Sequence, residues 1–450
     1  MAEPTSCCAV PGSYCARVDA LFNVPGIHVV DVGWREDQLV LAVETGPTLA
    51  GCPGCGVVAE SHGRRSRRLH DIPALGAPVE LCWRVRRWRC EEPVCAVGVF
   101  TESDGLAEPR AKLTTRAAWW AIGCIQRDNA SIASIASIAS VARRLGVDWH
   151  TLWSAIKPLL HALADDPTRF AGVQVLGVDE HIWHHAPRPG KGPKELTGMV
   201  DLTHRKDANG QAKPQARLLD LVPGRSGPAY AGWLADRGED FRDGVKVATL
   251  DPFRGYANAI DDQLANAIAV LDAFHVVRLG MKAMEETRRR VQHEQLGHRG
   301  RKNDPLYRIR NVLRAGVEKL SERQLARLEA GLGAGDPGYE VTLAWHCYQK
   351  LCSAFASTDL RRGRRIAIEV IESFHTCPVI EIARLGRTLR EWRQQLLACF
   401  STRRANNGGT EAIDRIIELH RRIARGFRNP VNYRLRMILA AGRLAHPNLR

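Results

Sequence analysis

The stretch from 173 to 183, VQVLGVDEHIW, constrains the fold more than any other part of this sequence. Its valines and leucine, bounded by glycine, predict a short β-strand that is buried in a core. Asp179 and Glu180 follow this apolar run directly, so the strand carries negative charge beside the core. Such charge is costly unless it is paired or binds a metal ion. We therefore expect Asp179 to have partners from elsewhere in the chain.

Four further strands are predicted after this one. They are the apolar runs at 195–205, 216–224, 245–253 and 267–277, with a helix at 227–241 between the third and the fourth strand. The first three strands are close enough in sequence to form an antiparallel meander, whereas the last two follow helices and can add in parallel. A mixed five-stranded sheet with helices on its faces resembles the ribonuclease H fold.

A second acid stands where the fourth strand ends. If the first and fourth strands are neighbours, Asp251 and Asp179 meet at one edge of the sheet. Mg²⁺ prefers oxygen ligands, and two metal ions about 3.5–4 Å apart can stabilise both the attacking and the leaving oxygen of a phosphodiester. A third acid is then needed. The spacing leaves open Asp272, at the end of the fifth strand, and Glu411 and Glu418, which share one face of a later helix.

Two pairs of cysteines lie in a β-rich module near the amino terminus. Four thiolates in two close pairs can surround one tetrahedral Zn²⁺, which predicts a structural zinc site at Cys52, Cys55, Cys90 and Cys95. The second pair is spaced CxxxxC rather than CxxC. The alternatives are unliganded cysteines in a small β domain, or a histidine, His62 or His70, in place of one thiolate.

The chain is strongly basic, with a formal net charge of +15 from 64 Lys+Arg against 49 Asp+Glu, which predicts a polyanionic partner. Arginines alternate with Trp83 and Trp88 in the zinc-binding module, so that Arg84 and Arg86 share a strand face with Trp88, and Arg87 points the other way. We expect these arginines to contact DNA phosphates. A solvated sheet face would give the same pattern.

Residues 114 to 160 are predicted to be helical. Gly146 ends one helix and Asp148 caps the next, which spans 149–156 and is followed by Pro158. Two short helices around such a turn indicate a helix-turn-helix, although any helical hairpin gives a similar signal. The DNA-contacting candidates here are Arg143, Arg144, Trp149, His150 and Thr151. The repeat SIASIASIAS at 131–140 is expected to lengthen the entering helix.

Composition and targeting signals indicate the general class of the protein. With 45% hydrophobic and 25% charged residues, the chain of 450 residues is ordinary for soluble globular domains. The first residues have no basic segment followed by an apolar core, and no run reaches the roughly 18 apolar residues of a membrane span. We expect a cytoplasmic protein, associated with the nucleoid and not with a membrane.

Four separated motifs make the chain similar to the ISL-three family of insertion-sequence transposases. They are DE at 179–180, TLDPFRGYANAI at 249–260, VLDAFHVVR at 270–278 and NNGGTEAIDRIIELHRRIARGFRNPVNYRLRMIL at 406–439. The cysteine module and ARRLGVDWHT at 142–151 extend the resemblance over nearly the whole chain. It implies a DDE-type catalytic domain with the triad Asp179, Asp251 and Glu411 as ligands of Mg²⁺ or Mn²⁺.

The resemblance also implies a division into domains. We expect a zinc-binding basic β module at 1–110, a helix-turn-helix region at 111–168, a ribonuclease H-like catalytic domain at 169–277 and 401–450, and a helical insertion at 278–400.

The activity that follows is binding of the terminal inverted repeats of an insertion sequence, metal-dependent strand cleavage and strand transfer, by a homo-oligomer, expected to be a dimer, on double-stranded DNA. Two alternatives are a DNA-binding regulator derived from a transposase that has lost catalysis, and a ribonuclease H-like structure-specific nuclease.

Overall fold

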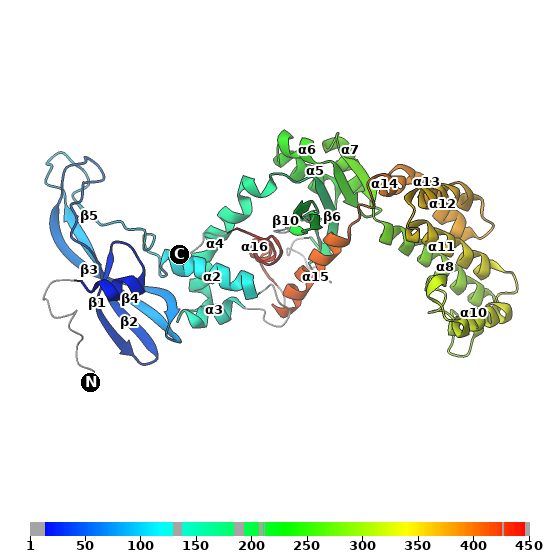
Figure 1. The fold of residues 1–450 in the computed structure, drawn as a ribbon, viewed down its shortest axis with the longest axis horizontal. Helices are drawn as coiled ribbons and strands as arrows, with labels where there is room; N and C mark the ends of the chain where they lie inside the picture. The colour runs from blue at the N-terminus through cyan, green and yellow to red at the C-terminus, as the bar shows by residue number, and fades with distance from the viewer. Residues whose placement is uncertain are drawn as a thin grey trace. The chain divides into compact units, whose positions relative to one another are not determined.

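The computed structural model describes residues 14–128, 137–183, 193–206, 210, 212–424 and 427–445. The chain forms two compact units, drawn in Figure 1. Unit 1 comprises Met1–Asp166 with Val431–Arg450, and unit 2 comprises Pro167–Pro430. These units divide the carboxyl-terminal segment at 430, whereas the sequence analysis kept 401–450 in one domain. The domain boundaries expected from the sequence stay a prediction. No helix within the described residues is long and apolar enough to cross a membrane.

Unit 1 begins with a small β-sheet. Its elements are helix α1 (Ala16–Phe22) and strands β1 (Ile27–Arg35), β2 (Gln38–Thr45), β3 (Glu60–Ala74), β4 (Ala77–Arg89) and β5 (Val99–Thr101). The strand order is β1-β2-β4-β3, and β5 pairs with β4. β1 and β2 pair antiparallel as a hairpin. Alternation along β4 buries Trp83 and Val85 in the core and leaves Arg84 exposed, as a period of two requires.

Four helices complete unit 1: α2 (Thr115–Asp128), α3 (Ile138–Arg144), α4 (Trp149–Asp165) and α16 (Pro430–Ala441). Gly146 has a φ of +70° between α3 and α4, and the Asp148 carboxylate caps α4 by accepting the Thr151 N–H at 2.9 Å. Gln126 in α2 donates to the Leu444 carbonyl at 2.8 Å, which ties the end of the chain to these helices.

The helix expected to end at Ile156 is longer than predicted, because α4 continues through Pro158 to Asp165. Buried Ile156, Leu160 and Ala164 extend its apolar face beyond the proline. Pro158 has no N–H to donate to the Ser154 carbonyl, and Ser154 is exposed to solvent. In the repeat at 131–140, residues 131–136 lie outside the described residues, and Ile138 begins α3.

Unit 2 contains the predicted mixed sheet. Its strands are β6 (Val175–Ile182), β7 (Glu195–Asp201), β10 (Arg217–Pro223), β11 (Val247–Leu250) and β12 (Ile268–Leu271), with β8 (His204–Lys206) and β9 (Ala212–Pro214) forming a separate pair. The order is β10-β7-β6-β11-β12. β6, β7 and β10 pair antiparallel, whereas β11 is parallel to both β6 and β12. The antiparallel meander followed by two parallel strands is therefore confirmed.

Helices lie on both faces of this sheet. The segment η2 (Pro167–Phe170) precedes β6, and the helices after β10 are α5 (Gly227–Asp236), α6 (Glu239–Gly244) and α7 (Arg254–Gln263). Leu176 and Val178 in β6 belong to the core that α5 and α7 share. Gly177, between these two residues, points to the opposite face of the sheet and meets α15 (Gly408–Ile423). This helix runs beside β6 in Figure 1. The segment 227–241, predicted as one helix, forms two.

The long helical insertion starts directly after β12. Its elements are α8 (Ala273–Leu296), α9 (Pro305–Arg308), η3 (Val317–Lys319), α10 (Glu322–Gly335), α11 (Glu340–Ala356), α12 (Leu360–Ser373), η4 (Phe374–Thr376), α13 (Ile380–Glu391) and α14 (Arg393–Ser401). The strand predicted for 267–277 is too long, because the Asp272 carboxylate accepts the His275 N–H at 3.1 Å and starts α8. Buried Val276 and Met284 then follow helical spacing.

Candidate active site

Three carboxylates gather beside β6 and the carboxyl end of β11. Asp251 follows β11 directly, whereas Asp179 and Glu180 lie within β6, which continues to Ile182 instead of ending at the acids as expected. The two strands are in parallel register, with Val178 beside Leu250, so Asp179 and Asp251 come next to each other. One oxygen from each of Asp179, Glu180 and Asp251 lies within 4.8 Å of the others. The meeting of Asp179 and Asp251 at one edge of the sheet, expected from the sequence, is what the structure shows.

Each of these acids has few neutralising partners. Asp179 Oδ1 accepts the Glu180 backbone N–H at 2.7 Å, and Glu180 Oε1 pairs with Arg225 Nη2 at 3.2 Å. Glu180 Oε2 is buried and has no hydrogen-bond partner within the described part of the chain. Burial, and then the charge of Asp251, raise the pKa of Asp179 to about 7. A cation placed among these oxygens would offset that repulsion.

A fourth carboxylate reaches Asp179 from α15. Burial and the neighbouring charge of Asp179 raise the pKa of Asp414 well above its usual range, and the two carboxyl groups share a hydrogen bond. Asp414 was missed by sequence reasoning. It stands three residues after Glu411 on the same helix, so the helical repeat could have suggested it once Glu411 was chosen.

His275 connects the acids of two strands. Its Nδ1 lies 3.0 Å from Asp251 Oδ1 and 3.2 Å from Asp272 Oδ2. Burial alone would lower the pKa of His275, but the hydrogen bonds to Asp251 and Asp272 outweigh it and raise the pKa to about 10. The side chain is therefore an imidazolium at neutral pH. His275 was also missed, although its place in the first turn after Asp272 was visible in the sequence.

The three rivals for the third acid occupy different surroundings. Asp272 is buried, and its oxygens accept the Asn407 N–H at 2.8 Å and two groups of His275. Glu418 pairs with two arginines, first Arg421 and then Arg422, whose hydrogen bonds hold its pKa at about 2. Glu411 has one ion-pair contact, with Arg415 at 3.9 Å.

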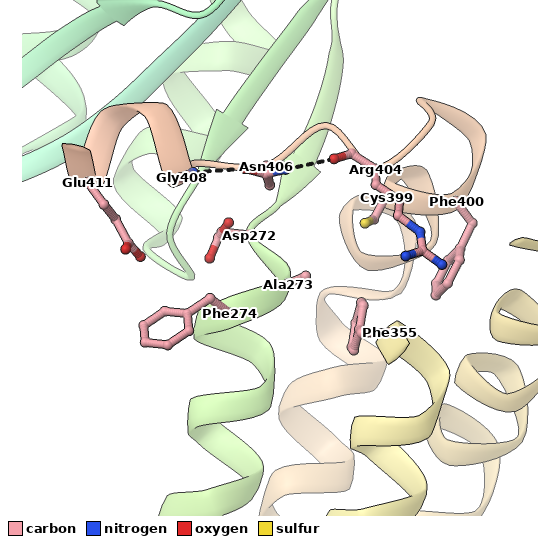
Figure 2. Close-up of a pocket in the computed structure, with 10 residues that line it drawn as sticks. All are labelled: Asp272, Ala273, Phe274, Phe355, Cys399, Phe400, Arg404, Asn406, Gly408 and Glu411. Carbon is pink, nitrogen blue, oxygen red and sulfur yellow. Dashed lines mark hydrogen bonds between the residues drawn. The ribbon is translucent and has the colours of Figure 1, made fainter. Parts of the chain in front are cut away.

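Glu411 reaches the acids through the group around His275. One atom each from Asp272, His275 and Glu411 lie within 4.8 Å of one another, and His275 in turn contacts Asp251. Figure 2 shows the Glu411 side chain next to Asp272 and above Phe274. Asp179, Asp251 and Glu411 thus lie in one neighbourhood, but their side chains form two overlapping groups rather than one three-acid cluster.

A cavity of about 290 Å³ opens beside Glu411. Its lining comes from the start of α8, the ends of α11 and α14, the loop before α15 and the first turn of α15. Figure 2 shows these residues: Asp272, Ala273, Phe274, Phe355, Cys399, Phe400, Arg404, Asn406, Gly408 and Glu411. Phe274, at 59% exposure, is the large apolar side chain most open to solvent in this lining.

His181 lies within β6 and does not belong to the carboxylate group. Burial lowers the pKa of His181 to about 4, so its ring is neutral. His184 and His185 lie outside the described residues.

The four predicted zinc ligands form one cluster in unit 1. Cys52 Sγ lies 3.6 Å from Cys95 Sγ, and Cys55 Sγ lies 3.5 Å from Cys90 Sγ. Thiolates at 2.3 Å from a tetrahedral zinc ion stand about 3.8 Å apart. Neither His62 nor His70 belongs to this cluster, in which all four members are cysteines. The residues present therefore fit a structural Zn²⁺.

The DNA-contacting candidates on β4 are placed differently from one another. Arg84 is exposed. Arg86 is half-buried, and its guanidinium donates to the Thr45 carbonyl at 2.9 Å, so it also holds the sheet together. Arg87 is half-buried.

The candidates around α3 and α4 lie on the surface of unit 1. Arg143 and His150 are exposed, and Trp149 is 38% exposed. The Arg144 guanidinium stacks 4.8 Å from the centre of the Trp120 ring. Thr151 is engaged in the cap of α4, since its hydroxyl donates to Asp148 at 2.6 Å.

Comparisons with known proteins match both units. A family model of the ISL-three DDE type, described as Transposase, matches residues 176–437, more than half of the chain. A second model, described as the zinc-finger of transposase IS204/IS1001/IS1096/IS1165, matches residues 48–95. No curated protein sequence matches the chain. A solved structure, the Drosophila P element transposase strand transfer complex, aligns with 12% identity and a TM-score of 0.38, over 72% of this chain and 91% of that chain.

Proposed function

This chain belongs to the ISL-three family of DDE transposases, and we propose that it cuts and joins DNA strands at a magnesium site formed by Asp179, Asp251 and Glu411. The resemblance stated from the motifs is confirmed by the family match, and the protein is a DNA transposase. The sheet order of unit 2 supports a ribonuclease H-like catalytic domain, with Glu411 supplied after the helical insertion.

One observation carries the catalytic proposal. Asp179 and Asp251 each follow the last parallel pair of β6 and β11, Val178 and Leu250, and their oxygens lie within 4.8 Å of each other and of Glu180. A group of half-buried and buried carboxylates this close, with one unpartnered oxygen on Glu180 among the described residues, fits a divalent cation bound by oxygen ligands. When bound, Mg²⁺ (or Mn²⁺) would supply charge stabilisation for in-line displacement at phosphorus.

The chain's own residues prepare the site for that chemistry. His275 donates to Asp251 and so fixes which oxygen of Asp251 remains for a ligand. Arg225 pairs with Glu180 and partly offsets the local negative charge. Glu411, on the first turn of α15, is proposed as the third ligand from the family resemblance; its one ion-pair contact among the described residues, at 3.9 Å, leaves its carboxylate available.

We assign DNA-end recognition to unit 1. Arg84 and Arg87 on the zinc-binding module would contact phosphates, and the exposed start of α4, with Trp149 and His150, would enter the major groove as the second helix of a helix-turn-helix. The net charge of +15 supports a DNA partner. The inverted repeats at the two ends of the element would be held by a homo-oligomer, and the DNA-bound protein would be found with the nucleoid.

An assay with a labelled inverted-repeat end, purified protein and Mg²⁺ tests this function. We expect strand cleavage followed by joining of the freed 3′-hydroxyl to target DNA. Cleavage without joining would identify a structure-specific nuclease instead. Specific binding without cleavage would identify a regulator.

A further inference from the structure

Asn407 is a fully buried polar residue at the point where the chain returns from the helical insertion. It is 0% exposed and directly precedes α15, whose Glu411 N–H donates to the Asn407 carbonyl at 3.0 Å. The residue therefore stands one helical turn before the proposed third acid.

The Asn407 side chain bonds to both central strands of the sheet. Its Nδ2 donates to the Val178 carbonyl on β6 at 3.2 Å and lies 3.4 Å from Asp251 Oδ1, next to β11. Its Oδ1 accepts the Thr249 hydroxyl on β11 at 2.9 Å. Because the Val178 carbonyl can only accept, the amide nitrogen must face it, which fixes the orientation of the amide.

The Asn407 backbone makes the third connection. Its N–H donates to Asp272 Oδ1 at 2.8 Å, and Asp272 also caps α8 and contacts His275. Asn407 thus bonds to β6 next to Asp179, to β11 near Asp251, and to the acid that follows β12.

We propose that Asn407 is a positioning residue that fixes α15, and with it Glu411, relative to Asp179 and Asp251. The inference rests on the proposed function of these three acids. Buried amides whose hydrogen bonds are all satisfied hold one arrangement, since each alternative leaves a buried group without a partner. A displacement of about 1 Å at a catalytic group can reduce the rate roughly 100-fold.

The test compares Asn407→Ala and Asn407→Asp with the matched control Asn406→Ala in the full-length protein. Asn406 is the neighbouring exposed residue, and its side chain bonds to the Arg404 carbonyl and the Gly408 N–H within the loop. Two readouts are used: amide hydrogen exchange of residues 408–411 without DNA or metal, and kcat, KM and the half-maximal Mg²⁺ concentration for cleavage of an inverted-repeat end.

We expect Asn407→Ala to speed exchange in the first turn of α15, to lower kcat roughly 100-fold, to raise the half-maximal Mg²⁺ concentration, and to leave KM for DNA unchanged. Asn407→Asp is nearly isosteric but cannot donate to the Val178 carbonyl, so it should not restore activity. Asn406→Ala removes the acceptor of the Gly408 N–H, so its exchange should rise at residue 408 alone, whereas exchange of residues 409–411 and kcat should match the wild type.

Wild-type exchange and kcat in Asn407→Ala, or full activity in Asn407→Asp, would overturn the inference. A wild-type protein that shows no metal-dependent cleavage would instead contradict the proposed function. In that case the exchange of residues 408–411 still decides whether Asn407 fixes α15.

Discussion

Gly177, in the middle of β6, makes room for the start of α15. A Cβ at this position would overlap Thr410 Oγ1 and would lie 2.8 Å from a Leu202 methyl and 2.9 Å from Asn407 Oδ1. Carbon atoms do not approach a Cβ this closely in folded proteins, so Gly177→Ala must push α15 away from the strand.

The magnitude of the effect follows from the packing. Thr410 and Asn407 are both 0% exposed, and their neighbours leave them little freedom to move. Inserting one methyl group into such a core costs about 1–3 kcal/mol. For a domain of this size the Tm should fall by roughly 2–12 °C. Because Glu411 moves with α15, cleavage should fall by about 100-fold, which exceeds what the lost stability alone would cause at room temperature.

Gly198→Ala in the neighbouring strand β7 is the matched control. A Cβ there would lie 3.4 Å from a Leu221 methyl and 3.8 Å from the Asp179 carbonyl, which is ordinary contact. Thermal unfolding and the rate of metal-dependent cleavage of an inverted-repeat end are measured for both variants. Equal Tm and equal cleavage in the two alanine variants would refute the close packing of α15 on β6.

Three further predictions concern the acids and the zinc cluster. Asp179→Ala, Asp251→Ala and Glu411→Ala should each abolish cleavage and leave binding of the DNA end intact in a gel-shift assay. Any one of them with wild-type cleavage removes that residue from the site. Cys55→Ser should lower the zinc content, measured by atomic absorption, from one ion per chain and weaken DNA binding; an unchanged zinc content would contradict the cluster. Glu418→Gln should retain cleavage, whereas its Tm should fall below that of the wild type near neutral pH. Because arginine hydrogen bonds lower the Glu418 pKa to about 2, that difference should shrink as the pH falls from 4.5 towards 2.

Short-range patterns were sufficient to predict the sheet of unit 2. Apolar runs and alternating patterns located all five strands. Strands that follow one another closely were expected to pair antiparallel, and strands that follow helices were expected to pair in parallel. The contact between Asp179 and Asp251 followed, because parallel neighbours bring their carboxyl ends to one edge. The four cysteines were equally predictable from the sequence, since they form two close pairs, which the structure places in the segments after β2 and after β4.

Errors arose where tertiary packing overrides local preference. Val276 and Val277 favour a strand, but the Asp272 cap and a buried helix face place them in α8. Pro158 usually ends a helix, yet the apolar face of α4 continues beyond it.

The third acid could not be chosen by spacing. Glu411 came from the family resemblance, since 160 residues and a helical insertion separate it from Asp251. Asp414 and Asn407 were missed because their partners lie on strands far away in the sequence, whereas the contact of His275 with Asp251 follows only once β11 and β12 are known to pair. Only the assembled sheet shows that an asparagine before a Gly-Gly pair bonds to both central strands.

Anomalous X-ray scattering from crystals of the protein soaked in Mn²⁺ with an inverted-repeat end tests the central assignment most directly. We predict a peak between the carboxylates of Asp179 and Asp251, with Glu411 turned towards the bound DNA strand as a further ligand. A peak confined to the group of Asp272, His275 and Glu411, with none at Asp179, would contradict the account.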